Sequence, residues 1–246
     1  FYKDIPFNFT EDLDFYIDNL VDVNQVLEYS DLHDLCLKRK NIYGKKLIEN
    51  VIEFGCGTGW LTNTLSYTYK KDLTSVDFTS KAIAKAKAVS KKLNVEPSYI
   101  CSDIFDYKDQ NLYDLVISLG VLHHTKNCYL AFEKITSYIK TGGYIYIGLY
   151  HYWGRKPMLD FLKSYTRWYG ENSAFNLFKK MSRNSNNIEH SYSWFRDQVL
   201  HPHETQHTLE EVSEWLEKFD LKLKSTSINS YKSISNISQK ELFKLE

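Results

Sequence analysis

The sequence predicts an α/β fold, with a doubly wound, mostly parallel sheet, helices on both faces and an inserted helical, aromatic cap. Apolar runs suited to buried strands alternate with helical segments over residues 47–150. The alternation stops over residues 151–207, which are rich in aromatic and polar side chains. It resumes at Thr208, where Thr-Leu-Glu-Glu has the pattern of a capping box that opens a helix.

These changes of pattern divide the chain into four parts. Residues 1–46 form a helical lead-in, residues 47–150 a core, residues 151–207 a cap or substrate lid, and residues 208–246 a helix and strands that complete the core. Strands are expected at residues 51–54, 73–78, 98–104, 113–120, 142–150 and 221–228, with a further strand toward Glu246, and helices at residues 61–69, 80–93 (capped by Ser80) and 128–140.

Composition limits the classes of function. Lys+Arg and Asp+Glu are 31 each, so the zero net charge argues against a surface devoted to nucleic acid. The chain lacks an apolar run long enough to span a membrane. Four dispersed cysteines without a CxxC pair predict free thiols in a reducing, cytoplasmic compartment. Because the sequence begins with Phe1, it is expected to be a trimmed or excised part of a longer polypeptide.

A glycine-rich turn follows the first core strand in VIEFGCGTGW. Gly55, Gly57 and Gly59 alternate there, and Trp60 stands where a dinucleotide fingerprint would have its third glycine. A strand that runs through a glycine turn into a helix is a nucleotide-binding device. Asp77 follows Gly59 by 18 residues and ends the next strand, where a carboxylate can accept hydrogen bonds from a ribose diol.

Four segments in order resemble class I S-adenosylmethionine-dependent methyltransferases of the small-molecule type: EFGCGTG, SVDF, SDIF, and the pair SLGVLHHT and KTGGYIYIGLY. The resemblance covers about 100 residues, with Thr141 where this family usually has proline. It implies a Rossmann-like fold and S-adenosylmethionine as cofactor, with S-adenosylhomocysteine as product. The cofactor-binding residues that we expect are Glu53, Gly55, Cys56, Gly57, Gly59, Asp77, Phe78, Asp103, Ile104 and Leu119.

The resemblance assigns Asp77 to the ribose hydroxyls and Asp103 to the neighbourhood of the adenine amino group, and Phe78 offers a face for the adenine. Two alternatives remain open for the acids. Asp103 also suits ordinary turn chemistry after a strand. Glu53 either orients the glycine turn or the methionine amino group, or is a carboxylate satisfied by backbone N–H groups.

Methyl transfer from a sulfonium is an in-line displacement, which needs alignment, exclusion of water and, for a protonated acceptor, a base. The His123-His124 doublet supplies a candidate base, and segment 193–207 predicts a polar lid over the cofactor cleft. A capping histidine and a loop packed by its own side chains are the alternatives. The catalytic candidates are His124, His201 and His203, and the substrate-binding candidates are Tyr150, His151, Arg155, Trp194, Asp197 and Glu204.

Arg155 is expected to present a fork to a substrate carboxylate or phosphate, unless it is a surface arginine. His201, His203 and His207 have the spacing HxHxxxH, which matches no familiar zinc motif, so no metal is expected.

The function predicted from these features is methyl transfer to a small molecule. Two alternatives stay open. One is a protein or RNA methyltransferase, for which the basic cluster at residues 38–46 is the main feature, although no Asp/Asn-Pro-Pro-Tyr tetrapeptide is present. The other is a non-catalytic cofactor-binding domain of a larger polypeptide.

Overall fold

A computed structural model describes residues 48–182, 188–231, 234–235 and 237–246, together with Leu13, Asp14, Ile17 and Leu32. Apart from those four positions, the expected lead-in helices lie outside the described residues, as does the basic cluster at residues 38–46. Among the residues described, no helix is both long and apolar enough to cross a membrane.

The core is a five-stranded sheet in which every neighbouring pair of strands is parallel, so the predicted sheet is confirmed. The strand order β3-β2-β1-β4-β5 means that the chain moves outward from β1 to β3 and then returns to the other side of β1. Carboxyl ends of all strands therefore meet at one edge, with a topological switch between β1 and β4. The strands are β1 (Asn50–Phe54), β2 (Asp72–Asp77), β3 (Ser98–Cys101), β4 (Tyr113–Leu119) and β5 (Ile139–Gly148).

Alternate residues of the central strands enter two separate hydrophobic clusters, one on each face of the sheet. On one face, Ile52 packs in a cluster with Phe132 of α6 and Trp215 of α10. On the other face, Val51 packs in a cluster with Leu65 of α4. Helices therefore cover both faces, as expected for a parallel sheet. These helices are α4 (Trp60–Tyr69), α6 (Cys128–Thr136) and α10 (Leu209–Lys218), while α5 (Ser80–Leu93) packs against α4, β2 and β3.

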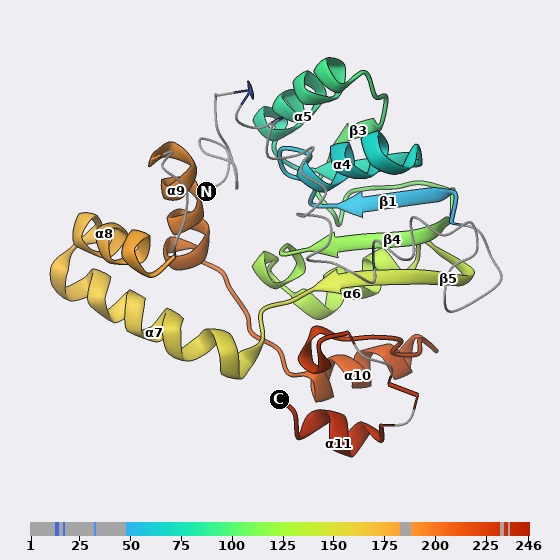
Figure 1. The fold of residues 1–246 in the computed structure, drawn as a ribbon. Helices are drawn as coiled ribbons and strands as arrows, with labels where there is room; N and C mark the ends of the chain where they lie inside the picture. The colour runs from blue at the N-terminus through green and yellow to red at the C-terminus, as the bar shows by residue number, and fades with distance from the viewer. Residues whose placement is uncertain are drawn as a thin grey trace.

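The cap is helical and has a hydrophobic core of its own. Buried side chains at Leu162, Phe178 and Phe195 form this core with their neighbours. Figure 1 shows the cap helices beyond the carboxyl ends of the strands, on the side where β5 leads into α7. The cap comprises α7 (Tyr152–Tyr169), α8 (Glu171–Met181), α9 (Ile188–Phe195) and a π-helical turn, η2 (Arg196–Leu200).

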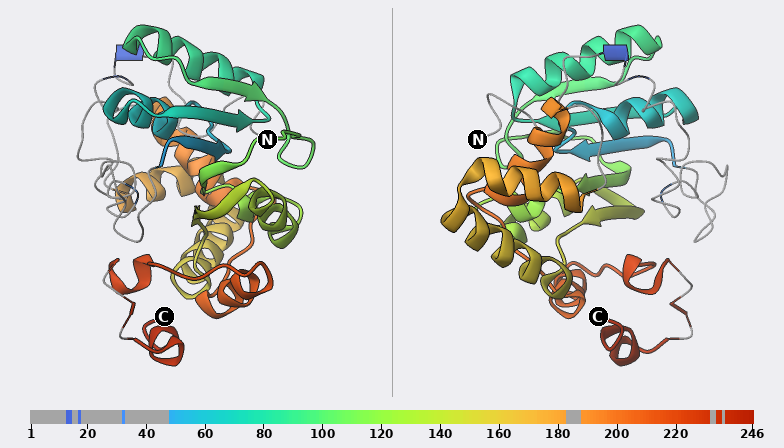
Figure 2. Two further views of the ribbon diagram at one scale, coloured as in Figure 1. Left: turned by 90° about the vertical axis from the view of Figure 1, so that its right-hand side faces the viewer. Right: turned by 60° about the vertical axis from the view of Figure 1, so that its left-hand side comes forward.

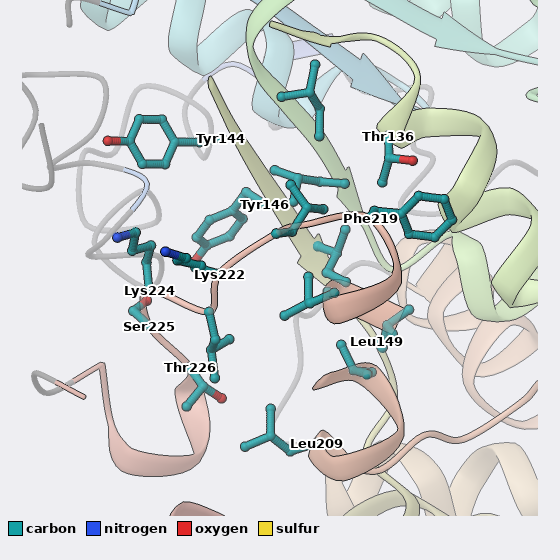
Figure 3. Close-up of a pocket in the computed structure, with 18 of the residues that line it drawn as sticks. Thr136, Tyr144, Tyr146, Leu149, Leu209, Phe219, Lys222, Lys224, Ser225 and Thr226 are labelled. Carbon is teal, nitrogen blue, oxygen red and sulfur yellow. The ribbon is translucent and has the colours of Figure 1, made fainter. Parts of the chain in front are cut away.

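The strand predicted at residues 221–228 is wrong, because this segment pairs with no described strand and ends in a short turn, η3 (Ser227–Asn229). Leu221 and Leu223 still pack against the core cluster, which explains the alternating Leu-Lys pattern without a hydrogen-bonded ladder. A cavity of about 990 Å³ separates β5 from the segment (Figure 3).

The expected strand toward Glu246 is also wrong. A short helix, α11 (Gln239–Phe243), occupies that stretch, and Ser238 and Glu241 form its capping box. Figures 1 and 2 show α11 beyond α10, apart from the sheet. Local capping thus decides the structure of the last residues, and no sheet edge reaches them.

Candidate functional site

The glycine turn after β1 contains two kinds of glycine. Gly55 has φ of +77°, and a Cβ at that position would lie 2.6 Å from Cγ1 and 2.9 Å from Cβ of Val121. Gly57 has φ of +52°, and a Cβ there would meet no atom within 4 Å. Gly55 is thus required by packing against the turn that follows β4, whereas Gly57 faces open space that a ligand can enter.

Asp77, at the end of β2, holds the turn. Its two carboxylate oxygens accept hydrogen bonds from the backbone N–H of Gly57 (2.9 Å) and of Thr79 (2.8 Å). Thr79, rather than Ser80, is the residue that precedes α5. Burial raises the pKa of Asp77, and these N–H groups partly offset that effect. A carboxylate has about four acceptor sites, so Asp77 can still accept from ribose hydroxyls.

Glu53 lies beneath the turn and is nearly inaccessible. Its carboxylate accepts a hydrogen bond from the Thr62 hydroxyl, which also lies 2.6 Å from the Ser75 hydroxyl. Desolvation is the main cause that raises the pKa of Glu53 to about 7. Both the hydroxyl and the backbone N–H of Thr62 are partners of the Glu53 carboxylate, so its contacts join the end of β1 to α4 beneath the turn.

The other expected cofactor residues surround this turn. Phe78 exposes 49% of its surface beside Asp77, and Asp103 is exposed and accepts a hydrogen bond from the Phe105 backbone N–H. Ile104 and Leu119 pack at the margins of the two core clusters, and Cys56 is buried, with the pKa of its thiol raised by desolvation.

These residues fit a nucleoside-bearing cofactor. The open position at Gly57 follows β1, beside the switch between β1 and β4, and the carboxylate of Asp77 and the exposed ring of Phe78 stand at the carboxyl end of the neighbouring β2. Ligands of open α/β sheets bind at this place. The residues supply a close backbone approach, an acceptor for a diol and an aromatic face.

A second group of polar side chains is buried where the turn after β4 meets the cap. The turn η1 (Leu122–His124) carries two of them, β5 leads directly to a third, and the cap supplies the rest. Rings of His123 and Tyr150 stack at 4.0 Å, and those of His124 and His201 stack at the same distance. We call this set the polar cluster; its members are His123, His124, Tyr150, Asp197, Gln198 and His201.

Asp197 lies at the centre of the polar-cluster contacts and is 4% exposed. Its Oδ2 accepts from the Gln198 amide at 2.8 Å and lies 3.4 Å from the Tyr150 hydroxyl. Its Oδ1 lies 3.7 Å from Nε2 of His124. The first residues of the cap's π-helical turn, η2, thus lie against the histidine doublet.

His123 is fully buried, and neither of its ring nitrogens has a hydrogen-bond partner. Desolvation lowers the pKa of His123 to about 2, and it also lowers that of His201 to about 3. Both imidazoles are therefore neutral near neutral pH. His203 differs from them, because its ring is exposed and its backbone carbonyl, 3.0 Å from Nδ1 of His124, makes the contact with the cluster.

Two of the three guanidinium nitrogens of Arg155 are paired within the protein, whereas Nη1 is buried without a hydrogen-bond partner. Its Nε and Nη2 donate to the two carboxylate oxygens of Glu204 at 3.0 and 2.8 Å, and Nη2 also donates to the Gln198 carbonyl. The guanidinium group covers the Tyr150 ring at 4.3 Å and is buried. Arg155 and Glu204 thus join α7 to the segment that leaves the cap, and a surface arginine is excluded.

His151 and Trp194, two of the expected substrate-binding residues, make their contacts within the protein. The Nδ1 atom of His151 accepts from the Gly154 N–H and so caps α7, while Nε2 donates to Glu246 at 2.9 Å. Trp194 packs against the core of the cap. No three histidine, cysteine, aspartate or glutamate residues within the described ranges are grouped to hold a metal ion.

One residue of the polar cluster, Gln198, was not among the candidates from the sequence. It donates to both Asp197 and Tyr150, while His123, the other half of the candidate doublet, packs against the Tyr150 ring. Thr205, whose N–H donates to the His123 carbonyl at 2.9 Å, was not a candidate either, and the local sequence contains no signal for either contact.

Comparisons with known proteins agree with this geometry. A family model described as "Methyltransferase domain" matches residues 46–221. A malonyl-acyl-carrier-protein O-methyltransferase of Bacillus cereus is 25% identical over 170 residues, which cover 69% of this chain and 58% of the relative. A ubiquinone biosynthesis O-methyltransferase of Rickettsia canadensis is 30% identical over 93 residues, covering 38% of this chain and 39% of the relative. The chain spans between 27% and 58% of the first three curated relatives.

Solved structures show the same fold. The plantazolicin methyltransferase BpumL in complex with SAH has a TM-score of 0.55 at 20% identity, covering 94% of this chain and 79% of that chain. PKMT2 from Rickettsia typhi in complex with AdoHcy has a TM-score of 0.63 at 18% identity, covering 85% of this chain and 45% of that chain.

Proposed function

The chain belongs to the methyltransferase-domain family, whose cofactor is S-adenosylmethionine, and we propose that it transfers the methyl group to a small-molecule acceptor. The observation that supports the acceptor class is the buried polar cluster between the turn after β4 and the cap. A site covered by cap side chains suits a small molecule better than an exposed protein or RNA strand. Bound S-adenosylmethionine supplies a methyl group already activated by the positive sulfur.

In this proposal the chain's own residues position the reactants and remove a proton. Asp77, Phe78 and Asp103 bind the nucleoside, while Gly57 allows its close approach to the backbone. Cap residues 196–207 cover the acceptor and exclude water. His124 is the proposed base, because its Nε2 faces Asp197 while the His203 carbonyl fixes its Nδ1.

The neutral His201 supports the ring of His124 by stacking, and the proposed role of His203 is limited to its carbonyl. Tyr150, Asp197 and the Arg155–Glu204 pair form the acceptor side of the proposed site. The names of the relatives support a small or carrier-bound acceptor, since they specify malonyl-acyl-carrier protein, ubiquinone biosynthesis and plantazolicin.

A fractionated labelling assay tests the proposed acceptor class. The protein is incubated with methyl-labelled S-adenosylmethionine and a cell extract, and small metabolites are then separated from protein and RNA. Label among the small metabolites is the expected result. Label confined to protein or RNA would overturn the small-molecule acceptor, and absence of label from every fraction would support the non-catalytic alternative.

A variant pair tests the proposed base. His124→Asn should lower kcat/KM by about 100-fold or more, the usual contribution of general acid–base catalysis, with cofactor affinity unchanged. His190→Asn is the matched control, because His190 lies in the cap beside Trp60 and Trp194. Equal activity of the two variants would contradict the role of His124.

A further inference from the structure

Helix α7 of the cap has a buried side and a broad side of exposed apolar residues. Leu159 and Leu162 are buried, and Leu162 belongs to the core of the cap. Other positions of the helix, which recur at helical intervals, hold exposed side chains that are mostly large and apolar. We call this side the aromatic face; its members are Trp153, Pro157, Met158, Phe161, Trp168 and Tyr169. Figure 1 shows α7 running from the end of β5 along the outer margin of the cap.

The aromatic face is largely open to solvent. Trp168 exposes 80% of its surface, Trp153 61% and Phe161 52%. The half-buried Tyr165 connects two of the rings, because its centroid lies 6.1 Å from that of Phe161 and 4.6 Å from that of Tyr169. Isolated apolar side chains are common on protein surfaces, whereas a contiguous apolar face marks a site that binds a partner or a membrane.

Basic side chains follow one border of the aromatic face. Lys156, Lys163 and Arg167 lie one or two turns apart, between the aromatic face and the buried side of the helix, and we call them the basic row. Lys163 and Arg167 are exposed, and Nζ of Lys156 lies 3.2 Å from the carboxylate of the exposed Asp160. With three cations beside one carboxylate, this border of α7 is positively charged.

This combination of side chains matches the surface of an anionic bilayer. Tryptophan and tyrosine favour the boundary between lipid and water, where an apolar ring and a polar edge are both satisfied. An amphipathic helix with an aromatic side and Lys or Arg beside it lies in the plane of that boundary and does not span the membrane. Anionic headgroups attract the basic residues. A second copy of the chain would instead place the same positive row near this one, which is unfavourable.

We propose that the aromatic face and the basic row of α7 bind the surface of an anionic lipid bilayer, with α7 lying in the interfacial plane. The buried side of α7 then remains packed in the cap, so binding needs no unfolding of the helix. This inference goes beyond the proposed function, because it concerns where the protein works and is independent of its acceptor.

Co-sedimentation with lipid vesicles tests the surface on the unmodified chain. One set of vesicles contains phosphatidylcholine alone, and the other contains phosphatidylcholine mixed with phosphatidylserine. Binding to the mixed vesicles should be at least about 10-fold stronger, and it should weaken as salt is added. Absence of binding to the mixed vesicles, or equal binding to both sets, would overturn the proposal.

A pair of charge-reversal variants tests the basic row. Lys163→Glu combined with Arg167→Glu should lower binding to the mixed vesicles by about 10-fold or more. The matched control is Lys87→Glu combined with Lys91→Glu, an exposed basic pair on α5 with the same spacing and the same change in net charge. Equal losses in the two double variants would attribute binding to net charge and overturn the role of α7.

Trp168→Ser tests the aromatic face, because membrane binding of an interfacial helix grows with the apolar area that it buries. It should lower vesicle binding by about 10-fold, whereas Leu130→Ser, at an exposed leucine of α6, should leave it unchanged. Circular dichroism checks that both variants keep their fold. Unchanged vesicle binding by Trp168→Ser would overturn the proposal. So would a dimer that Trp168→Ser dissociates, in a protein that binds no vesicles, since the face would then belong to a second copy.

Discussion

Substituting Gly55 with alanine tests whether the glycine turn is constrained by packing or by the cofactor. The new Cβ would lie 2.6 Å from Cγ1 and 2.9 Å from Cβ of Val121, and the residue would keep φ of +77°. Holding a non-glycine residue in the left-handed region costs about 1–2 kcal/mol. Overpacking of a well-filled site adds about 1–3 kcal/mol. The free energy of unfolding should therefore fall by about 2–5 kcal/mol.

Gly57→Ala is the matched control for this prediction. Its φ of +52° brings a similar backbone cost of about 1–2 kcal/mol, but a Cβ would meet no atom within 4 Å. This variant should therefore lose less stability than Gly55→Ala. It should weaken cofactor binding instead, because the added methyl group enters the space that the cofactor needs.

Urea unfolding, with calorimetric titration of S-adenosylhomocysteine, separates these two effects. Adding Val121→Ala to Gly55→Ala should recover the overpacking part of the loss and leave the backbone part, which a double-mutant cycle measures as a favourable coupling. Equal losses of unfolding free energy in Gly55→Ala and Gly57→Ala, with no coupling to Val121, would refute the packing argument.

Three further predictions concern buried charges. The folded-state pKa of Glu53 is raised from 4.5 to about 7, so its ionisation should lower the free energy of unfolding as pH rises through that interval, by about 3 kcal/mol in full. Urea unfolding at pH values on either side of the interval measures this loss, and Glu53→Gln should abolish it. Asp77→Asn leaves one oxygen for two backbone N–H groups, so unfolding free energy should fall by about 1–3 kcal/mol and titrated cofactor affinity should fall with it. Arg155→Met should cost about 3–5 kcal/mol by leaving Glu204 buried without its partner, and Glu204→Leu added to it should restore most of the loss in thermal or urea unfolding. Unchanged unfolding curves in any of the three would contradict the corresponding contact.

The sheet and the glycine turn could be predicted because their signals are local. Val51 to Phe54 form one apolar run, and Gly55 and Asp77 stand at strand ends, where the order of strands brings them together. The helix that begins after Thr208 was also predicted, but Glu211 completes only half of the expected capping box. Its backbone N–H donates to Thr208, while its side chain bonds His207.

The polar side of the site could not be predicted to the same depth, since its pairs connect residues far apart in sequence. Arg155 and Glu204 are 49 positions apart, and nothing in the local pattern of either residue indicates the pair. The contact between His124 and the His203 carbonyl could not be predicted either. The sequence pointed to the side chain of His203, whereas its backbone carbonyl makes the contact. The strand prediction for residues 221–228 was wrong for a related reason. Alternation of apolar and polar residues specifies an extended segment with one apolar face, but it does not specify a partner strand.

The hydrophobic core of the cap is separate from the two hydrophobic clusters of the sheet. The cap packs around Leu162 and Phe178 without sharing buried residues with the clusters of the sheet, so its interior can vary while the glycine turn stays intact. Polar contacts then fix the cap to the turn after β4, through the Thr205 N–H to the His123 carbonyl and the His203 carbonyl to His124. Because the glycine turn shares no buried hydrophobic residue with the cap, a substitution in the cap interior is expected to leave the glycine turn intact.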